Sequence, residues 1–368
     1  MTNFRSLFLC VVFATLFFAC SNSDDIDNGQ PNSSCTAEQS GSKSILLNYT
    51  SDYDSGELRW YNDMASPVIS SGKFSFHQDS KIAVFGETIY VLERMGADNI
   101  SCIPAKCLGD EKSIKQISLE DGSNPQGIAV TDGKGYIALH SEDYLQIINP
   151  VSCALGGKIN LPIKNSYASA IIASGDTLLV AMQRLEAIEG GLIATKPGLL
   201  ALINVKTESL IDTIQMNYYN PHSMLLSKGK LYIASIRYNP PLGITVDAEN
   251  CGIEALDLAR GEFETIYNGE AGVSEMSLDE ENGIIYASFY IEYGSSPLVP
   301  ITIADKKVGT KLTGISDAYS GSVYDYETKQ LFIADRAGLK VYNPATKKMQ
   351  ALESKGILPP YSLAIFMP

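Results

Sequence analysis

Four arginines hold equivalent places in a repeated sequence pattern, at the predicted end of a short apolar strand. They are Arg94, Arg184, Arg237 and Arg336. A guanidinium presents a planar fork of N–H donors that fits a carboxylate or a phosphate. The formal net charge of the chain is −14, so four arginines at one structural position would form a concentrated cationic rim. We expect this arginine rim to bind an anion, although each arginine alone is more simply read as the partner of an adjacent acid such as Glu93 or Asp335.

The pattern that places the arginines recurs along most of the chain. "SNPQGIAVTDGKGYIALH" (123–140) and "YNPHSMLLSKGKLYIASI" (219–236) share Asn-Pro, an apolar triplet, a turn and Tyr-Ile-Ala, and weaker copies begin near 79, 169, 274 and 320. Each copy predicts a β-hairpin, and each is followed by a second pair of strands. The central residues of the copies lie about 43–54 residues apart, and they are Tyr90, Tyr136, Leu179, Tyr232, Tyr286 and Phe332. Four strands per unit of that length predict a β-propeller.

The C-terminal segment "PPYSLAIF" (359–366) repeats the first strand of the pattern without a second strand after it. Segments 44–49, 56–62 and about 67–76 supply the three missing strands at the other end of the chain. We therefore predict an all-β fold of seven four-stranded antiparallel blades, one of them closed by residues 361–367 pairing with the N-terminal strands. Closure of this kind removes an exposed sheet edge.

The Pro-x-Gly-Ile-Ala-Val, Tyr-Ile-Ala and Ile-Asn-Pro cadence resembles the YVTN/NHL-like seven-bladed propellers over residues 44–368. The resemblance implies a fold and leaves function open, because propellers include binding modules, scaffolds, lactonases and lyases. It also implies that the start of each innermost strand and the end of each second strand share one face, where ligands bind at the mouth of the axial channel.

Further polar residues fall on that face. His140 and Tyr290 take the place of the arginine in two repeats, and Gln126, His222 and Tyr361 begin inner strands. Long connections at 184–198, 237–251 and 290–300 would carry tyrosines over the same face. The candidate ligand site therefore consists of Arg94, His140, Arg184, Arg237, Tyr290, Arg336, His222, Gln126 and Tyr361.

Signals for catalysis are weaker than those for binding. The chain has no nucleophile elbow, phosphate-binding glycine loop or His-Glu-x-x-His motif, and its histidines are too scattered for a spaced zinc site. Two alternatives stay open: His222 could act as a base, and a lactonase-like calcium site could form from inner-strand oxygens. The residues that could supply those oxygens are Asn124, Asn220, Glu275 and Asp317. We predict no catalytic residue, metal or cofactor, and the negative charge argues against nucleic acid as a partner.

The N-terminus predicts export. Arg5, a short apolar run and Ala19 form a signal peptide over residues 1–19, and the Cys20 that follows resembles the lipidated cysteine of bacterial lipoproteins. The alternative is an ordinary secreted protein with a coincidental cysteine. Residues 20–43 are polar and acidic and predict a flexible tether. Ser21 and the acids at 24–27 resemble sorting signals for the outer membrane and the cell surface.

Five cysteines remain in the predicted mature chain besides Cys20. Cys102 and Cys107 flank a plausible turn and are the predicted local disulfide, whereas the pairing of Cys35, Cys153 and Cys251 stays open. Five is an odd number, so at least one thiol is left over or paired elsewhere.

These features favour a binding module in the cell envelope, anchored to a membrane by lipid, for an acidic small ligand, a glycan or an envelope protein. The alternative is a propeller enzyme, a metal-dependent lactonase-like hydrolase or a lyase, with its site at the axial mouth.

Overall fold

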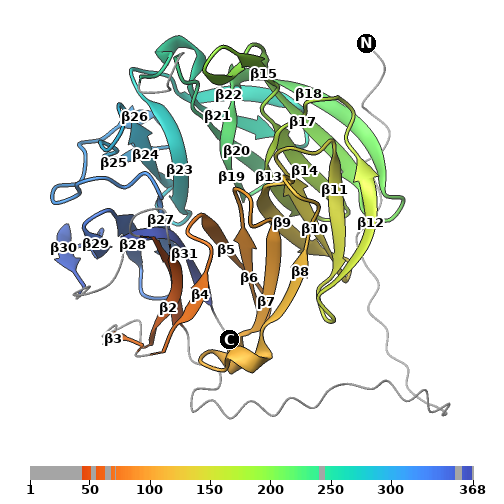
Figure 1. Ribbon diagram of the computed structural model, residues 1–368. Helices are drawn as coiled ribbons and strands as arrows, with labels where there is room; N and C mark the ends of the chain where they lie inside the picture. Colours follow the sequence, from red (N-terminus) through yellow and green to blue (C-terminus); the bar gives the residue numbers. More distant parts are fainter. Residues whose placement is uncertain are drawn as a thin grey trace, which may run out of the picture. The chain divides into compact units, whose positions relative to one another are not determined.

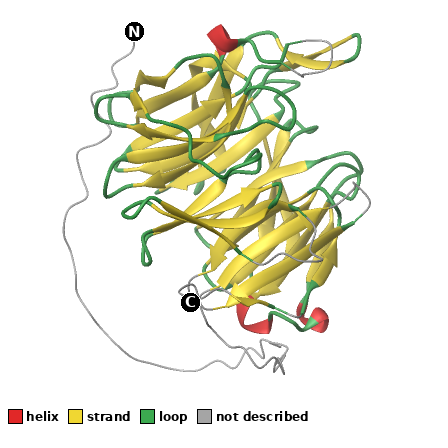
Figure 2. Ribbon diagram, turned by 90° about the vertical axis from the view of Figure 1, so that its left-hand side faces the viewer, coloured by secondary structure: helices red, strands yellow, loops and turns green. Residues whose placement is uncertain are grey.

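The computed structural model describes residues 44–50, 55–62, 68–70, 72–239, 245–352 and 359–366. The predicted signal peptide, Cys20 with its predicted lipid, the whole of the predicted tether and Cys35 lie outside these residues. Figures 1 and 2 show that the described chain consists of strands joined by loops, with very little helix. Its helical segments are single 3₁₀ turns, and they are Ala105–Cys107, Glu111–Ser113 and Ala248–Asn250. No helix among the described residues is long and apolar enough to cross a membrane.

Six four-stranded antiparallel sheets follow one another along the described chain (Figure 1). The first two are β5 (Ser80–Phe85), β6 (Thr88–Glu93), β7 (Asn99–Pro104) and β8 (Lys115–Ser118), then β9 (Pro125–Thr131), β10 (Lys134–Leu139), β11 (Tyr144–Asn149) and β12 (Ala154–Asn160). The next two are β13 (Ala168–Ser174), β14 (Thr177–Met182), β17 (Pro197–Asn204) and β18 (Ser209–Tyr219), then β19 (Pro221–Ser227), β20 (Lys230–Ser235), β21 (Gly252–Asp257) and β22 (Glu262–Tyr267). The last two are β23 (Gly272–Asp279), β24 (Ile284–Tyr290), β25 (Leu298–Thr302) and β26 (Lys307–Val308), then β27 (Ser322–Asp325), β28 (Gln330–Asp335), β29 (Gly338–Asn343) and β30 (Lys348–Ala351).

The two ends of the described chain meet in one further sheet. It contains β1 (Ser44–Thr50), β2 (Gly56–Asn62), β3 (Val68–Ile69), β4 (Phe74–Phe76) and β31 (Pro360–Phe366). β31 pairs antiparallel with β1, so the predicted closure by the C-terminal strand is confirmed. The sheet has five strands instead of the predicted four, because β3 and β4 both pair with β2. Regular four-stranded blades therefore number six in the described chain, where seven were predicted.

One loop predicted to lack secondary structure contains a small hairpin. β15 (Leu185–Ile188) pairs with β16 (Gly191–Ala194) between β14 and β17. This hairpin stands apart from the four-stranded sheet and projects from its edge.

Turn chemistry sets the register of the hairpins. Between β9 and β10, Asp132 and Gly133 have φ of 50° and 69°, the two positive values that a type I′ turn requires. Lys228 and Gly229 repeat this geometry between β19 and β20. The tight turns bring apolar residues of both strands to the same sheet faces.

The sheets stand in a ring around an axis. The first strand of each sheet contacts the first strand of the next, in the order β31, β5, β9, β13, β19, β23 and β27, and β27 contacts β31 again. Apolar clusters fill the space between adjacent sheets, and the repeated aromatics Tyr90, Tyr136 and Phe332 are at most 1% exposed within them. This arrangement is a β-propeller with four-stranded antiparallel blades.

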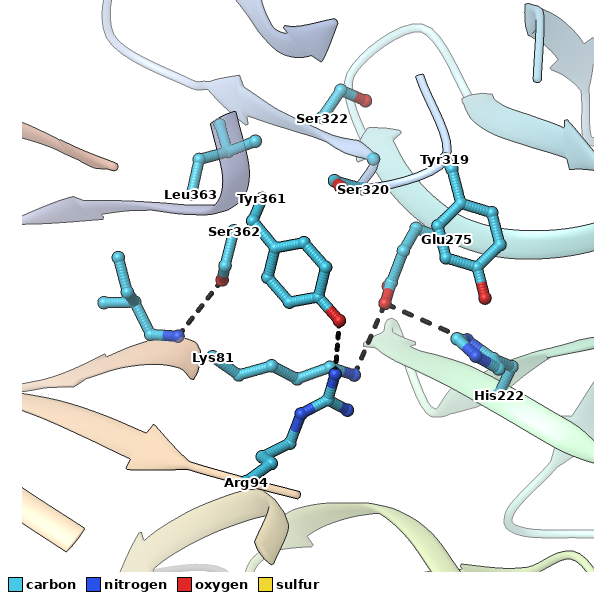
Figure 3. Close-up of a pocket in the computed structure, with 12 residues that line it drawn as sticks. Lys81, Arg94, His222, Glu275, Tyr319, Ser320, Ser322, Tyr361, Ser362 and Leu363 are labelled. Atoms are coloured by element: carbon cyan, nitrogen blue, oxygen red, sulfur yellow. Dashed lines mark hydrogen bonds and ion pairs between the residues drawn. The ribbon is translucent and has the colours of Figure 1, made fainter. Parts of the chain in front are cut away.

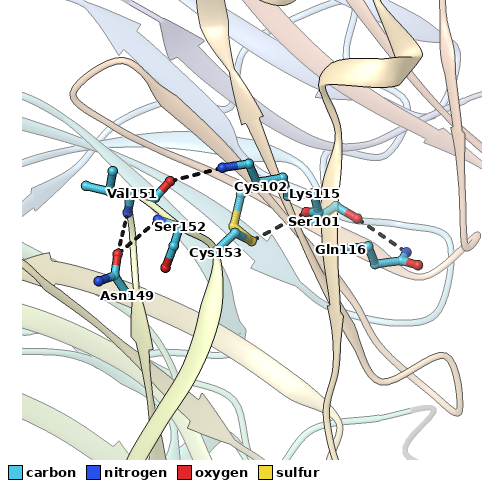
Figure 4. The surroundings of a disulfide bond; sticks show 8 residues. All are labelled: Ser101, Cys102, Lys115, Gln116, Asn149, Val151, Ser152 and Cys153. Carbon is cyan, nitrogen blue, oxygen red and sulfur yellow. Dashed lines mark hydrogen bonds between the residues drawn. A yellow bond between two sulfur atoms is a disulfide. The ribbon is translucent and has the colours of Figure 1, made fainter. Parts of the chain in front are cut away.

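The predicted disulfide between Cys102 and Cys107 is wrong. Cys102 in β7 bonds Cys153, which follows β11, and the bond joins two neighbouring sheets (Figure 4). Both sulfurs lie in the apolar cluster between those sheets. The residues beside Cys107, Ala105 and Leu108, pack instead in a different cluster, so the local turn carries Cys107 away from Cys102. Cys251 is a free, buried thiol.

Candidate functional site

A cavity of about 360 Å³ lies where the inner strands converge (Figure 3). Five strands (β5, β19, β23, β27 and β31), the turn before β27 and Arg94 after β6 contribute to its wall. The lining side chains that carry charge or an aromatic ring are Lys81, Arg94, His222, Glu275, Tyr319 and Tyr361. Its volume falls in the range of pockets that hold small ligands.

Arg94 is fixed at the edge of this cavity by partners from three sheets. Its Nε donates to Asp79 Oδ1 at 2.9 Å, its Nη1 to Gln126 Oε1 at 2.6 Å, and its Nη2 to the Tyr361 hydroxyl at 2.6 Å. Burial alone would lower the pKa of Arg94, but Tyr361 and Asp79 together raise it above its ordinary value. The guanidinium is therefore a permanent, preorganised cation with its fork already partly occupied.

Tyr361 belongs to the same hydrogen-bonded group as Arg94. Its hydroxyl oxygen accepts from Arg94, and the hydroxyl also interacts with Asp79. Burial, together with Asp79, raises the pKa of Tyr361, which keeps the phenol protonated at neutral pH. Arg94, Asp79 and Tyr361 therefore form one preorganised polar group at the edge of the cavity.

Lys81 and Glu275 reach toward each other across the cavity (Figure 3). Lys81 lies on β5 and Glu275 on β23, and Nζ is 3.7 Å from Oε1. Burial lowers the pKa of Lys81, and the attraction of Glu275 offsets this effect only in part. Both side chains are about one-quarter exposed, so a small molecule could contact either of them.

His222 on β19 faces the same carboxylate. Its Nδ1 lies 2.8 Å from the Ser274 carbonyl oxygen and 4.0 Å from Glu275 Oε1. A carbonyl oxygen can only accept, so Nδ1 carries the proton and Nε2 presents a lone pair. Burial, aided by the charge of Lys81, lowers the pKa of His222 to about 4. The imidazole is therefore neutral at pH 7 and acts as an acceptor.

Three tyrosines border the cavity on the side of Tyr319. The Tyr238 and Tyr319 hydroxyls are 3.1 Å apart, and the Tyr290 ring lies 5.3 Å from that of Tyr238 and 5.7 Å from that of Tyr319. Burial raises the pKa of Tyr319 and that of Tyr238. The cluster forms a rigid aromatic wall with protonated hydroxyls.

The structure brings five of the nine predicted site residues to this region. Arg94, His222 and Tyr361 line the cavity, Gln126 bonds to Arg94, and Tyr290 packs on Tyr319. The arginine rim does not gather around one cavity, because Arg94 is its single member in the wall. Arg184 donates to the Pro197 carbonyl at 3.1 Å.

The remaining predicted residues have other surroundings. Arg237 pairs with Asp247, donates to the Ala194 carbonyl and lies over the Tyr219 ring. Its guanidinium is therefore used in contacts with neighbouring loops. Arg336 is exposed. His140 packs against Tyr167, and burial lowers its pKa to about 4.

Lys81, Glu275 and Tyr319 are site residues that the prediction missed as ligand contacts. A signal for two of them exists in the repeats. In each sheet, one residue of the inner strand pairs with the central residue of the second strand, and the position of interest lies two residues before it. Four sheets have a small residue at this position, whereas two sheets have Lys81 and Glu275 there. The small residues are Gly127, Ala170, Ser223 and Gly321. A small residue there leaves the axis open, so these two long side chains mark a departure from the repeat.

The oxygens considered for calcium do not converge on one point, because Glu275 faces Lys81 in the cavity and the others lie in turns. Asn124 and Asn220 both have φ of 54° before a proline, as in turn chemistry, and Asn124 Oδ1 accepts from Gln126 at 2.8 Å. Asp317 Oδ1 accepts from the Tyr319 N–H. Within the described ranges, no group of three or more His, Cys, Asp or Glu side chains is placed to hold a metal ion.

Comparison with known proteins identifies a fold and no family. No family model matches the chain, and no curated protein matches it. Among solved structures, it is similar to a putative 6-phosphogluconolactonase from Bacteroides fragilis, with a TM-score of 0.63 and 12% identity over 90% of this chain and 99% of that one. It is also similar to hydrazine synthase from Kuenenia stuttgartiensis (TM-score 0.59, 11% identity, 88% and 98% covered) and to apo AztD from Citrobacter koseri (TM-score 0.55, 12% identity, 89% and 98% covered). Identities this low show the architecture alone, and that architecture is the β-propeller.

Proposed function

We propose that the chain is a binding module that takes a small organic anion, a carboxylate or a phosphate, into the axial cavity. The observation that carries the proposal is the convergence of Lys81, Arg94 and the Tyr361 hydroxyl on one cavity. These donors remain largely fixed without a ligand, so binding would require little reorganisation. Glu275 and the His222 Nε2 would accept from hydroxyl or amine groups elsewhere on the ligand.

Titration calorimetry with a panel of small carboxylates and phosphates tests the proposal. A charge-assisted hydrogen bond is worth about 1.5–3 kcal/mol, so Lys81→Met or Arg94→Gln should weaken binding by roughly tenfold to a hundredfold. Lys134→Met is the matched control, because Lys134 pairs with Glu208 at a different place on the surface. Equal affinity in the parent and the two cavity variants, with unchanged melting, would refute the proposal.

The second candidate function is a hydrolase or lyase acting at the same cavity. The neutral His222 with its unprotonated Nε2 favours it, since this nitrogen could accept a proton from a water or a substrate. Incubation with simple lactones, followed by titration of released acid, tests it. His222→Gln should abolish the release if the imidazole is the base, and an equal rate in the variant would exclude that role.

We also propose that the chain is a lipoprotein of the cell envelope, held by a diacylated Cys20 and the tether that follows. The support is the sequence pattern of residues 1–43. Acyl chains contribute about 0.8 kcal/mol per buried CH₂, which suffices for durable attachment. A Cys20→Ala variant should move to the soluble fraction, and retention in membranes after a high-salt wash would contradict the proposal.

The finer classification belongs with these proposals. We interpret the five-stranded sheet as a seventh, split blade, since β31 takes the innermost place that β5 and β9 take in their sheets. On that interpretation the chain is a YVTN/NHL-like propeller.

A further inference from the structure

We propose that Lys81 is a reactive amine that forms an imine with a short oxo acid held in the axial cavity. The inference rests on the proposed anion site and adds a covalent step to it. It arises from the placement of a nucleophilic nitrogen, a carboxylate, a neutral imidazole and an anion-binding arginine around one small space.

The position of Lys81 is unlike that of an ordinary surface lysine. It stands on an inner strand at a position that is Gly, Ala or Ser in four other sheets, and its side chain extends over the cavity toward Glu275 (Figure 3). The strands that carry the two residues, β5 and β23, are separated in the ring by β31 and β27 on one side. The ammonium therefore lies near the axis, where the cavity wall surrounds it.

The protein environment of Lys81 favours the neutral amine over the ammonium more than bulk water does. Burial lowers the pKa of Lys81, and the nearby charge of Arg94 acts in the same direction. Glu275 and Asp79 oppose this effect without cancelling it. A desolvated lysine beside another cation is the usual arrangement of a nucleophilic lysine.

Glu275 and His222 can accept and return the protons that imine formation requires. The ammonium gives one proton to Glu275, and the nitrogen lone pair attacks the carbonyl carbon of the oxo acid. A C–N bond forms, and the C=O π pair moves to oxygen, which takes up that proton. The nitrogen then loses a second proton to His222 Nε2, and the resulting imidazolium returns it to the hydroxyl. The hydroxyl leaves as water while the nitrogen lone pair forms the C=N bond, which gives the protonated imine. The balance is amine plus carbonyl to imine plus water, with no oxidant or reductant.

The carboxylate of the oxo acid would be held at the Arg94 guanidinium, whose Nη1 has one N–H beyond its bond to Gln126. Lys81 lies close enough to Arg94 for the guanidinium charge to act on its pKa. A short acid, with its carbonyl next to its carboxylate, can span the two. Pyruvate is the smallest oxo acid with this arrangement whose carbonyl is a ketone.

The test is reductive trapping on the full chain. The protein is incubated with pyruvate and sodium cyanoborohydride, and the adduct is located by intact mass and peptide mapping. We expect one adduct, at Lys81, that is lost in Lys81→Arg and retained in Lys134→Arg. Acetone, a ketone like pyruvate but without the carboxylate, should label Lys81 more slowly than pyruvate and without dependence on Arg94.

A second measurement separates this inference from the proposed function. Lactate has the carboxylate of pyruvate but no carbonyl, so it reports anion binding alone. If lactate binds in an Arg94-dependent way while pyruvate leaves Lys81 unlabelled, the imine inference is wrong and the anion site stands. If neither binds, both are wrong. Adducts spread equally over surface lysines, unchanged in Lys81→Arg, would also overturn it.

Discussion

Glu254 should make the stability of the propeller depend on pH. It lies on β21 with no exposed surface and accepts from the Asn217 backbone N–H at 3.1 Å and from Asn217 Nδ2 at 2.8 Å. These donors are neutral amides, which compensate a buried negative charge poorly. Burial therefore raises the pKa of Glu254 from 4.5 to about 7.

The sign of the effect follows from linkage. A carboxyl whose folded pKa exceeds its unfolded value contributes stability that is fully present below about pH 4.5 and is lost as the pH rises through 7. The shift of about 2.5 pKa units corresponds to a loss of about 3 kcal/mol at 1.36 kcal/mol per unit. Because the side chain is fully buried, solvent does not screen its charge.

Urea unfolding of the parent and of Glu254→Gln at pH 5 and pH 8 measures this loss. Gln keeps the size and one acceptor oxygen but cannot ionise, so the variant should gain about 2.5 kcal/mol relative to the parent between the two pH values, since part of the loss has already occurred at pH 5. His140 and His222 titrate in both proteins and cancel in the difference. The control is Glu186→Gln at an exposed site, which should show no such gain. A parent–variant difference that is independent of pH would refute the reasoning.

Three further predictions concern the contacts that hold the ring together. Cys102→Ala with Cys153→Ala removes a cross-link with a sequence separation of 51, and should lower the free energy of unfolding in urea by about 4 kcal/mol. Phe366→Ala empties a buried site on the closing strand and should cost about 3–5 kcal/mol, with faster amide hydrogen exchange in β31 than in the parent. Arg237→Gln leaves the carboxylate of Asp247 without its cation and should cost about 1–3 kcal/mol in thermal unfolding, while binding in the axial cavity stays unchanged.

Ring closure could be predicted because one sequence pattern recurs along the chain. The similarity of "PPYSLAIF" to "NPHSMLL" identified an inner strand without partners, and the pairing of β31 with β1 confirms the inference. The extra strand in that sheet was not predictable, because β3 and β4 are only two and three residues long and carry no periodic pattern. Short strands of this kind are set by their neighbours more than by their own sequence.

The disulfide prediction failed because spacing along the chain was used in place of spacing in the fold. Cys102 and Cys107 are close in sequence, but a strand end and a 3₁₀ turn separate them. Cys153 lies 51 residues away in sequence and one sheet away in space. In a propeller, adjacent sheets contact over their whole faces, so covalent links between repeats are as accessible as links within one.

The site prediction used recurrence among the repeats as its signal. Comparison of repeats found positions where one residue type recurs, and the recurring arginines turned out to have different partners. A residue type that recurs at the same position of many blades indicates a role in the local structure of each blade. The useful signal was the opposite one, because Lys81 and Glu275 break a rule of small residues that the other inner strands keep.

That contrast gives a physical criterion for propellers of this kind. Each inner strand contributes a side chain at the same height on the axis, and the space there holds few long side chains at once. A blade that places a charged residue at that height fills space that its neighbours leave empty, and it desolvates the charge as it does so. Two such residues of opposite sign, Lys81 and Glu275, offset part of that cost for each other at 3.7 Å and still leave a cavity beside them. Packing alone would be satisfied by Ser or Gly at both positions, and this departure from the other inner strands is the reason for the ligand that we propose.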